Sequence, residues 1–226
     1  WANLPADGKI STTNGYGITV ALVAQNGQPV ASSNLFMMQA TSAETNVASI
    51  SAYLGLPTKV LTTFVKDSPI ADFIKRDLRT IDRDSVDCII ACMHWGNEYE
   101  RHENREQRRL AELLLREGVD VIIGSHPHVV QPFYADSTSV VFYSLGNLVS
   151  NQQRHYTDGG LIAEVEVIRC DTIEGLRYRA TAHPVWVLCP GYRILPCSVG
   201  DTLTMPAASR KLYERFMRET DELLYR

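Results

Sequence analysis

The stretch that decides the fold of this 226-residue chain is VDVIIGSHPHVV, residues 119–130. Its first part, residues 119–123, is an apolar run with the length of a buried strand. Its second part holds a glycine and then two histidines, His126 and His128, on either side of a proline. In α/β proteins, ligands bind outside the carboxyl ends of parallel strands. The stretch therefore predicts a buried strand that ends in a ligand site.

The elements around this strand form a βαβ crossover. Residues 86–93 are a second apolar run, of the kind expected for a strand covered on both faces. Residues 103–117 carry leucines at helical spacing, and Gly118 suits a left-handed cap at the end of that helix. A third strand is expected over residues 140–144. Strand, helix and strand within about 35 residues predict parallel strands.

The rest of the chain adds elements of a different kind. The patterns predict a strand over residues 17–24, helices over residues 41–55, 69–81 and 206–224, and a hairpin of residues 161–167 with residues 176–182. Leu212, Phe216, Leu223 and Leu224 are expected on one stripe of the last helix. We expect one mixed α/β domain over residues 1–226, with parallel strands in the middle and antiparallel strands later.

Composition excludes several classes of protein. The apolar fraction is 45% and the charged fraction 21%, which excludes disorder and coiled coil. Lys and Arg total 22 against 26 Asp and Glu, and the net charge of −4 argues against nucleic acid as a partner. No apolar run reaches the roughly 18 residues that span a bilayer. The chain opens at Trp1 without a signal-peptide pattern, so we expect any export signal or anchor to lie upstream.

Three histidines follow two of the predicted strands. His94 comes directly after residues 86–93, and His126 and His128 come after residues 119–123. Because parallel strands end at the same edge of a sheet, these imidazoles are expected in one cleft. Pro127 favours an extended His126, which would project His126 and His128 to the same side. Three neighbouring imidazoles predict a divalent metal site.

Several residues keep two interpretations. Trp95, beside His94, walls a pocket or belongs to the core. Cys189 and Cys197 could pair, although nothing in the sequence forces it. The arginines of the predicted helix over residues 103–117 are balanced by glutamates, which favours a solvated face with local ion pairs over a polymer-binding patch.

Three motifs carry a family resemblance. They are HWGNEY at residues 94–99, GSHPHVVQ at residues 124–131 and YSLGN at residues 143–147. In order and spacing they resemble the CapA family of poly-γ-glutamate capsule synthesis proteins (the PGA_cap domain), which is related to the calcineurin-like metallophosphoesterases. The resemblance is specific over residues 86–150. It implies a metallophosphatase-like α/β fold, with layered sheets of mixed parallel and antiparallel strands flanked by helices, of which this chain is the C-terminal portion.

The resemblance also implies roles for individual residues. His94, His126 and His128 would be ligands of a divalent metal (Mn, Zn or Fe), with two metals in the longer protein. Glu98 would be catalytic, and Trp95, Gly146 and Asn147 would bind substrate. The implied reaction is metal-assisted hydrolysis.

The chain departs from the superfamily pattern in its early ligands. Those ligands come from a Gly-Asp strand end and an Asn-His pair, whereas this chain has no Asn-His and only one Gly-Asp, at residues 200–201. Two function classes therefore stay open. One is a metal-dependent hydrolase of capsule biosynthesis that acts on an anionic cell-envelope polymer or a phosphate ester. The other is a non-catalytic component with a degenerate site that binds polymer or partner subunits.

The resemblance further implies a setting. It favours an extracytoplasmic protein, associated with the membrane through an upstream segment, and capsule-synthesis membrane subunits as partners. A third interpretation, an amidohydrolase barrel, is disfavoured because that fold needs about eight βα units and places its HxH motif on the first strand.

Overall fold

The computed structural model describes residues 19–24, 36–41, 75–76, 78–84, 86–170 and 173–225. The chain divides into two compact units, Trp1–Val60 and Leu61–Arg226. In the first unit, β1 (Thr19–Ala24) pairs antiparallel with β2 (Phe36–Thr41). β1 confirms the described part of the predicted strand over residues 17–24, and β2 was not predicted. The predicted helix over residues 41–55 lies, apart from Thr41, outside the described residues.

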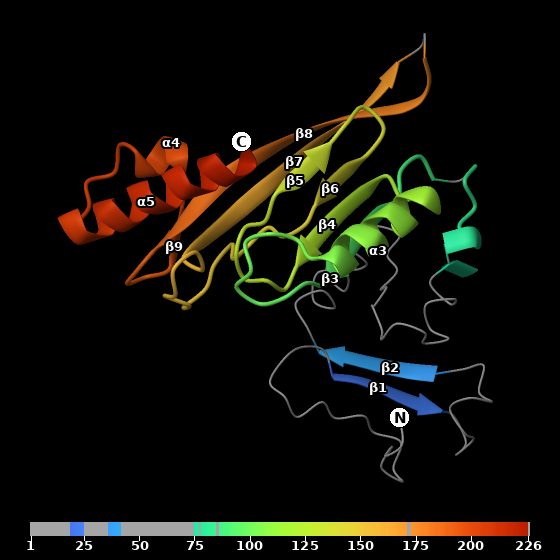
Figure 1. Ribbon diagram of the computed structural model, residues 1–226, viewed down its shortest axis with the longest axis horizontal. Coiled ribbons are helices and arrows are strands. Elements are labelled where there is room, and N and C mark those ends of the chain that lie inside the picture. The colour runs from blue at the N-terminus through green and yellow to red at the C-terminus, as the bar shows by residue number, and fades with distance from the viewer. Residues whose placement is uncertain are drawn as a thin grey trace. The chain divides into compact units, whose positions relative to one another are not determined.

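The second unit contains a four-stranded sheet built by the predicted crossover (Figure 1). Its strands, in spatial order, are β3 (Ile90–His94), β4 (Val121–Ser125), β6 (Val140–Phe142) and β5 (Phe133–Ala135). β3, β4 and β6 are parallel, and β5 is antiparallel to β6. Helix α3 (Arg105–Arg116) connects β3 to β4, and Gly118 follows it with a φ of 90°. The βαβ prediction and the left-handed cap are confirmed.

The prediction for the strand over residues 86–93 was partly wrong. β3 begins only at Ile90, because the Asp120 carboxylate accepts the N–H of Ile89 at 2.7 Å and takes the place of a strand partner. The strand is also not covered on both faces within the described residues, since Ala91 and Met93 are buried whereas Ile90 and Cys92 are exposed. β3 is thus an edge strand of this sheet with one buried face.

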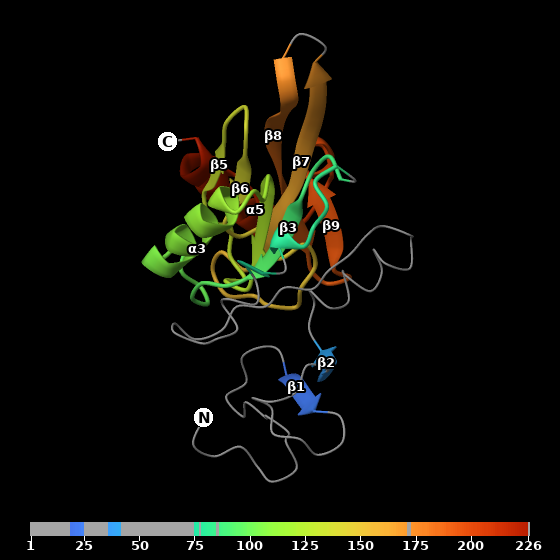
Figure 2. The ribbon, with the colours of Figure 1, turned by 90° about the vertical axis from the view of Figure 1, so that its right-hand side faces the viewer.

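A second, antiparallel sheet follows in the chain. The predicted hairpin is present and longer than expected, as β7 (Gly159–Cys170) and β8 (Ile173–Leu188), and β9 (Arg193–Pro196) pairs with β8. Figure 2 shows the paired β7 and β8 extending beyond the neighbouring strands. After the short α4 (Cys197–Gly200), helix α5 (Ala207–Leu224) confirms the predicted closing helix.

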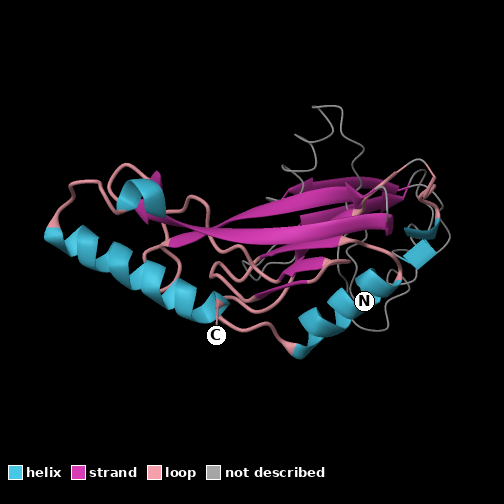
Figure 3. Ribbon diagram, turned by 90° about the horizontal axis from the view of Figure 1, so that it is seen from above, coloured by secondary structure: helices cyan, strands magenta, loops and turns pink. Residues whose placement is uncertain are grey.

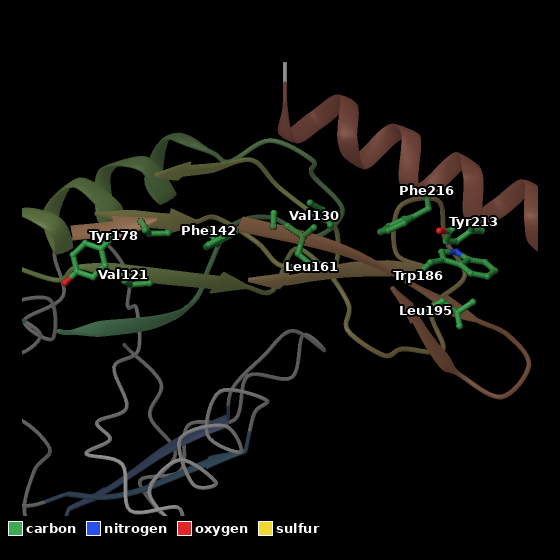
Figure 4. Packing of buried hydrophobic residues seen from close by; sticks show 11 residues of the cluster. Val121, Val130, Phe142, Leu161, Tyr178, Trp186, Leu195, Tyr213 and Phe216 are labelled. Carbon is green, nitrogen blue, oxygen red and sulfur yellow. The ribbon is translucent and has the colours of Figure 1, made fainter. Parts of the chain in front are cut away.

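Two apolar clusters pack against the two faces of the four-stranded sheet, although one face of β3 stays exposed. Because successive strand side chains point to opposite faces, Val121 of β4 joins the cluster shared with the second sheet, whereas Ile122 joins the cluster under α3. Figure 4 shows residues of the first cluster between the sheets, with Tyr213 and Phe216 of α5 beside Trp186. Tyr213 was not predicted on this stripe, and Leu212, which was, is exposed.

These layers place the unit in the α/β class. The strands lie together with helices outside them (Figure 3), and the mix of parallel and antiparallel sheets is that of a metallophosphatase-like fold, as predicted. Of the helix predicted over residues 69–81, the described residues 75–76 and 78–79 are helical. None of the helices in the described part of the chain is long and apolar enough to cross a membrane.

Candidate strand-end site

The histidine cluster, defined here as His94, His126 and His128, lies where β3 and β4 end. The parallel register pairs His94, the last residue of β3, with Ser125, the last residue of β4. The ring centroids of His94 and His126 are 4.5 Å apart, and those of His126 and His128 are 6.5 Å apart. The predicted convergence of the three imidazoles is therefore confirmed.

The backbone that presents this cluster is strained. His126 has a φ of 99° and His128 a φ of 59°, so the expected extended conformation of His126 was wrong. β4 ends at Ser125, and the chain turns there. In the turn, the Pro127 carbonyl accepts the N–H of Tyr99 at 2.8 Å. Tyr99 itself has a φ of 66°. Non-glycine residues held in this region cost about 1–3 kcal/mol each and gather at functional sites.

Asn147 orients His128. The Asn147 Nδ2 atom donates to the carbonyls of His128 at 3.2 Å and Thr157 at 2.9 Å, so its Oδ1 must be the atom that faces the imidazole. That oxygen is 3.0 Å from Nδ1 of His128. Since Oδ1 only accepts, Nδ1 carries the proton and Nε2 is left as the basic nitrogen.

Gly146 and Asn147, for which the resemblance implies substrate binding, contact other parts of the protein around His128. Asn147 is 9% exposed and spends its amide on protein partners, which leaves little of it for substrate. Gly146 forms an antiparallel bridge with Gly160, which links the loop after β6 to β7. Both residues therefore fix the position of His128 from the side of the second sheet.

Among the described residues, Glu98 places a carboxylate close to Nε2 of His128. Its Oε1 lies 3.9 Å from Nε2 of His128, and both side chains are partly exposed. This distance is longer than a hydrogen bond and within reach of one after a small rotation or through a water molecule. The arrangement suits the exchange of a proton between Glu98, His128 and a bound molecule.

Trp95 belongs to the core rather than to a pocket wall. It is 5% exposed and packs in the cluster under α3, and its Nε1 donates to the Tyr143 carbonyl at 2.8 Å. Gly124 makes this packing possible, because a Cβ at that position would overlap the Tyr143 carbonyl oxygen and lie 2.5 Å from the Trp95 Nε1. The Trp95 indole therefore packs against the end of β4.

Sequence reasoning missed two buried glutamines behind the site. Gln107 and Gln131 are each 1% exposed, and Nε2 of Gln107 donates to Oε1 of Gln131 at 2.8 Å. Gln131 in turn donates to the carbonyls of Glu100 and His102. Gln107 also completes a capping box with Asn104 at the start of α3. The spacing of Asn104 and Gln107 was the available signal.

The donor atoms of the cluster fit a metal in kind. Imidazole nitrogens and a carboxylate are ligands of Zn, Mn and Fe. Among the residues that the structure describes, no three His, Cys, Asp or Glu side chains are grouped so as to hold a metal ion by themselves. Taken alone, the described donors therefore form a partial ligand set rather than a complete centre.

The remaining expectations concern residues away from the site. His155 bonds Glu219 at 2.8 Å and His183 bonds Glu164 at 2.6 Å, so neither belongs to the cluster. Arg108 pairs with Glu103 and Arg109 with Glu106, which confirms local ion pairs on α3. Cys189 and Cys197 are both free thiols.

Layered mixed sheets with histidines at parallel strand ends define a metallophosphatase-like α/β protein. Within that class, the chain belongs to the bacterial capsule synthesis protein family PGA_cap, which matches residues 2–152. The match extends beyond the motifs at residues 86–150 to most of the N-terminal part of the chain.

Two curated relatives agree with this assignment. The PGA biosynthesis protein CapA of Bacillus subtilis (strain 168) is 44% identical over 67 residues, which cover 30% of this chain and 18% of that protein. The capsule biosynthesis protein CapA of Bacillus anthracis is 34% identical over 102 residues, which cover 40% of this chain and 25% of that protein. The matched segments thus span a quarter or less of either relative.

Proposed function

We propose that this protein acts in the biosynthesis of a poly-γ-glutamate capsule and that the histidine cluster is its hydrolytic site. The observation that carries the proposal is the strained backbone of His126 and His128 at the strand ends, where the centroid of the His126 ring lies 4.5 Å from that of His94 and 6.5 Å from that of His128. Membership of the capsule synthesis family and the names of the two relatives support the capsule role.

The residues take distinct parts in the proposed reaction. His94, His126 and His128 would contribute imidazole nitrogens to a divalent metal site (Mn, Zn or Fe). When bound, the metal would supply Lewis-acid polarisation of a phosphoryl or carbonyl oxygen. Asn147 keeps Nε2 of His128 basic, and Glu98, 3.9 Å from that nitrogen, takes up or delivers a proton.

The proposed substrate is an anionic cell-envelope polymer or a phosphate ester. The proposed setting is extracytoplasmic and membrane-associated, with capsule-synthesis membrane subunits as partners, because the family is one of capsule synthesis. Nucleic acid is not proposed as a partner of a chain with a net charge of −4.

A second candidate function is polymer or subunit binding without catalysis. It is favoured by the partial ligand set, since no three His, Cys, Asp or Glu side chains among the described residues are grouped so as to hold a metal ion. In this case the cluster would bind anionic groups as part of a capsule assembly.

Metal binding separates the two candidates. Calorimetry with Mn²⁺ and Zn²⁺ on the 226-residue chain, followed by assays of a phosphodiester and a γ-linked oligoglutamate, should show binding and metal-dependent hydrolysis. A His126→Ala/His128→Ala variant should lose both, whereas His183→Ala, which alters an exposed histidine of β8, should keep both. Binding without hydrolysis, or neither activity in a correctly folded chain, would favour the non-catalytic role.

A further inference from the structure

The side chain of Arg154 contacts the Tyr99 ring, which in turn contacts His128 of the histidine cluster. The guanidinium of Arg154 lies 4.2 Å from the centroid of the Tyr99 ring, and the Tyr99 ring stacks on His128 with centroids 6.2 Å apart and an interplanar angle of 27°. The Tyr99 ring thus contacts both Arg154 and His128. These contacts connect the loop after β3, which carries Tyr99, with the loop after β4, which carries His128, and the loop after β6, which carries Arg154.

No carboxylate among the described residues forms an ion pair with Arg154. Arg108, Arg109 and Arg179 each form an ion pair with a glutamate. Within the described part of the chain, Arg154 forms no such pair, and its side chain is exposed. A guanidinium held by its face against an aromatic ring keeps its N–H groups at the edge, where they can bind the two oxygens of an anion.

The loop that carries Arg154 is anchored to the residue that orients His128. The Arg154 carbonyl accepts the N–H and the hydroxyl of Thr157 at 3.0 and 2.8 Å. The Thr157 carbonyl then accepts Nδ2 of Asn147, whose Oδ1 contacts His128. Arg154 and His128 are therefore held in place by one continuous set of hydrogen bonds as well as through Tyr99.

A second arginine, Arg101, also lies on a tyrosine ring, but its guanidinium is bound to the protein. Arg101 lies 4.2 Å from the centroid of the Tyr156 ring, but it also donates to the Glu219 carbonyl at 3.0 Å, and Tyr156 stacks on His155 rather than on the cluster. Of these two arginines, Arg154 is therefore the one whose guanidinium is available to a ligand at the site.

We propose that Arg154, seated on Tyr99, binds an anionic group of the substrate next to the group held at the histidine cluster. The ligand chemistry is a carboxylate or phosphate with two oxygens for the guanidinium edge. In a polymer of γ-linked glutamate, a carboxylate recurs in every residue and would supply this second anion. The inference rests on the proposed function because it assigns the substrate class of the same site.

The test measures binding of two probes, a γ-linked hexaglutamate and inorganic phosphate, to the metal-free 226-residue chain. Arg154→Gln should weaken the hexaglutamate Kd by about tenfold, since a charge-assisted bidentate contact is lost. Tyr99→Leu should weaken it several-fold, and Tyr99→Phe, which keeps the ring, should leave it unchanged. Arg179→Gln on β8 is the matched control and should bind like the unmodified chain. Phosphate affected alone would identify a phosphate ester as the source of the anion.

The outcomes distinguish this inference from the proposed hydrolysis. If the histidines prove to be needed for hydrolysis while Arg154→Gln changes neither Kd nor KM, the inference is overturned and the function stands. If anion binding depends on Arg154 but no metal binds, hydrolysis fails and the anion site stands. Failure of the unmodified chain to bind either probe saturably, or an equal effect of Arg179→Gln, also overturns the inference.

Discussion

Asn147, in the loop after β6, fixes the tautomer of His128, in the loop after β4. Its Oδ1 lies 3.0 Å from Nδ1 of the imidazole, while its Nδ2 is committed to the carbonyls of His128 and Thr157. The amide therefore cannot turn around without placing an N–H against Nδ1 and breaking both bonds to carbonyls. One buried side chain thus decides which nitrogen of His128 is available for chemistry.

This arrangement predicts the protonation pattern of His128 in solution. In the neutral imidazole of the unmodified chain, the proton should reside on Nδ1, and the long-range ¹H–¹⁵N correlations of the ring should show that pattern. Asn147→Ala removes the acceptor, so the other tautomer should become populated. His183 of β8, which contacts Glu164 of β7, is an internal control whose ring signals should not change. A predominance of Nε2–H in the unmodified chain would contradict the assignment.

Gly124 predicts a steric effect on stability. An alanine there must displace the Tyr143 carbonyl or the Trp95 indole, and overpacking of this kind costs about 1–3 kcal/mol. Urea unfolding of Gly124→Ala should show this loss. The comparison is Gly191→Ala, where the space is open but the φ of 103° is unfavourable for alanine. A Gly124→Ala variant as stable as the unmodified chain would show that the end of β4 is not tightly packed.

The Gln107–Gln131 pair predicts energetic coupling between α3 and the loop after β4. Replacing either glutamine by alanine leaves a buried amide without its partner, at a cost of about 1–3 kcal/mol. Replacing both should cost less than the sum, with a coupling energy of about 0.5–3 kcal/mol in a double-mutant cycle of unfolding free energies. Strict additivity would mean that the two amides do not depend on each other.

Asp136 predicts a pH-dependent contribution from the turn between β5 and β6. The Tyr134 hydroxyl, with the hydroxyl and N–H of Thr138 and the N–H of Ser139, donates to its carboxylate and holds the pKa of Asp136 well below its usual range. A lowered folded-state pKa gives stability that is complete above the unfolded pKa of about 3.9 and is lost as the pH falls towards the folded value. Asp136→Asn should therefore be less stable than the unmodified chain at pH 7, with a difference that shrinks below about pH 4.

The control for this prediction is an exposed carboxylate of α5, in Glu214→Gln. Its unfolding free energy should differ from that of the unmodified chain by a small and nearly constant amount across the same pH range. If Asp136→Asn followed the same flat course, the hydrogen bonds to Asp136 would contribute no net stability.

The sequence predicted the elements of the fold whose patterns are strong and local. The apolar run before His126 and the helical leucines of α3 were enough to predict a crossover with parallel strands, and thus the meeting of His94 with His126. The start of β3 was misplaced because the Asp120 side chain, 31 residues away from Ile89, replaces a strand bond there. Such a long-range side-chain bond leaves no trace in apolar periodicity.

The candidate site was predicted in its residues and less well in their roles. The rule for the residue before a proline suggested an extended His126, whereas the bond from Tyr99 to Pro127 and the packing around it favour a φ of 99°. Asn147 was expected to bind substrate because the motif shows only that it is close to the site. Its burial and its three-way bonding depend on β7 and on the loop before it, which no local pattern reveals.

Gln107 connects the start of α3 to Gln131 behind the histidine cluster, and this connection constrains which substitutions evolution can accept there. The same amide closes the capping box of α3, reaches Gln131 and packs against Gly96, where a Cβ would lie 2.7–2.9 Å from it. A change at any one of these positions would disturb the contacts of the other two. Homologous lineages should therefore inherit residues 96, 107 and 131 as a block, or exchange them together.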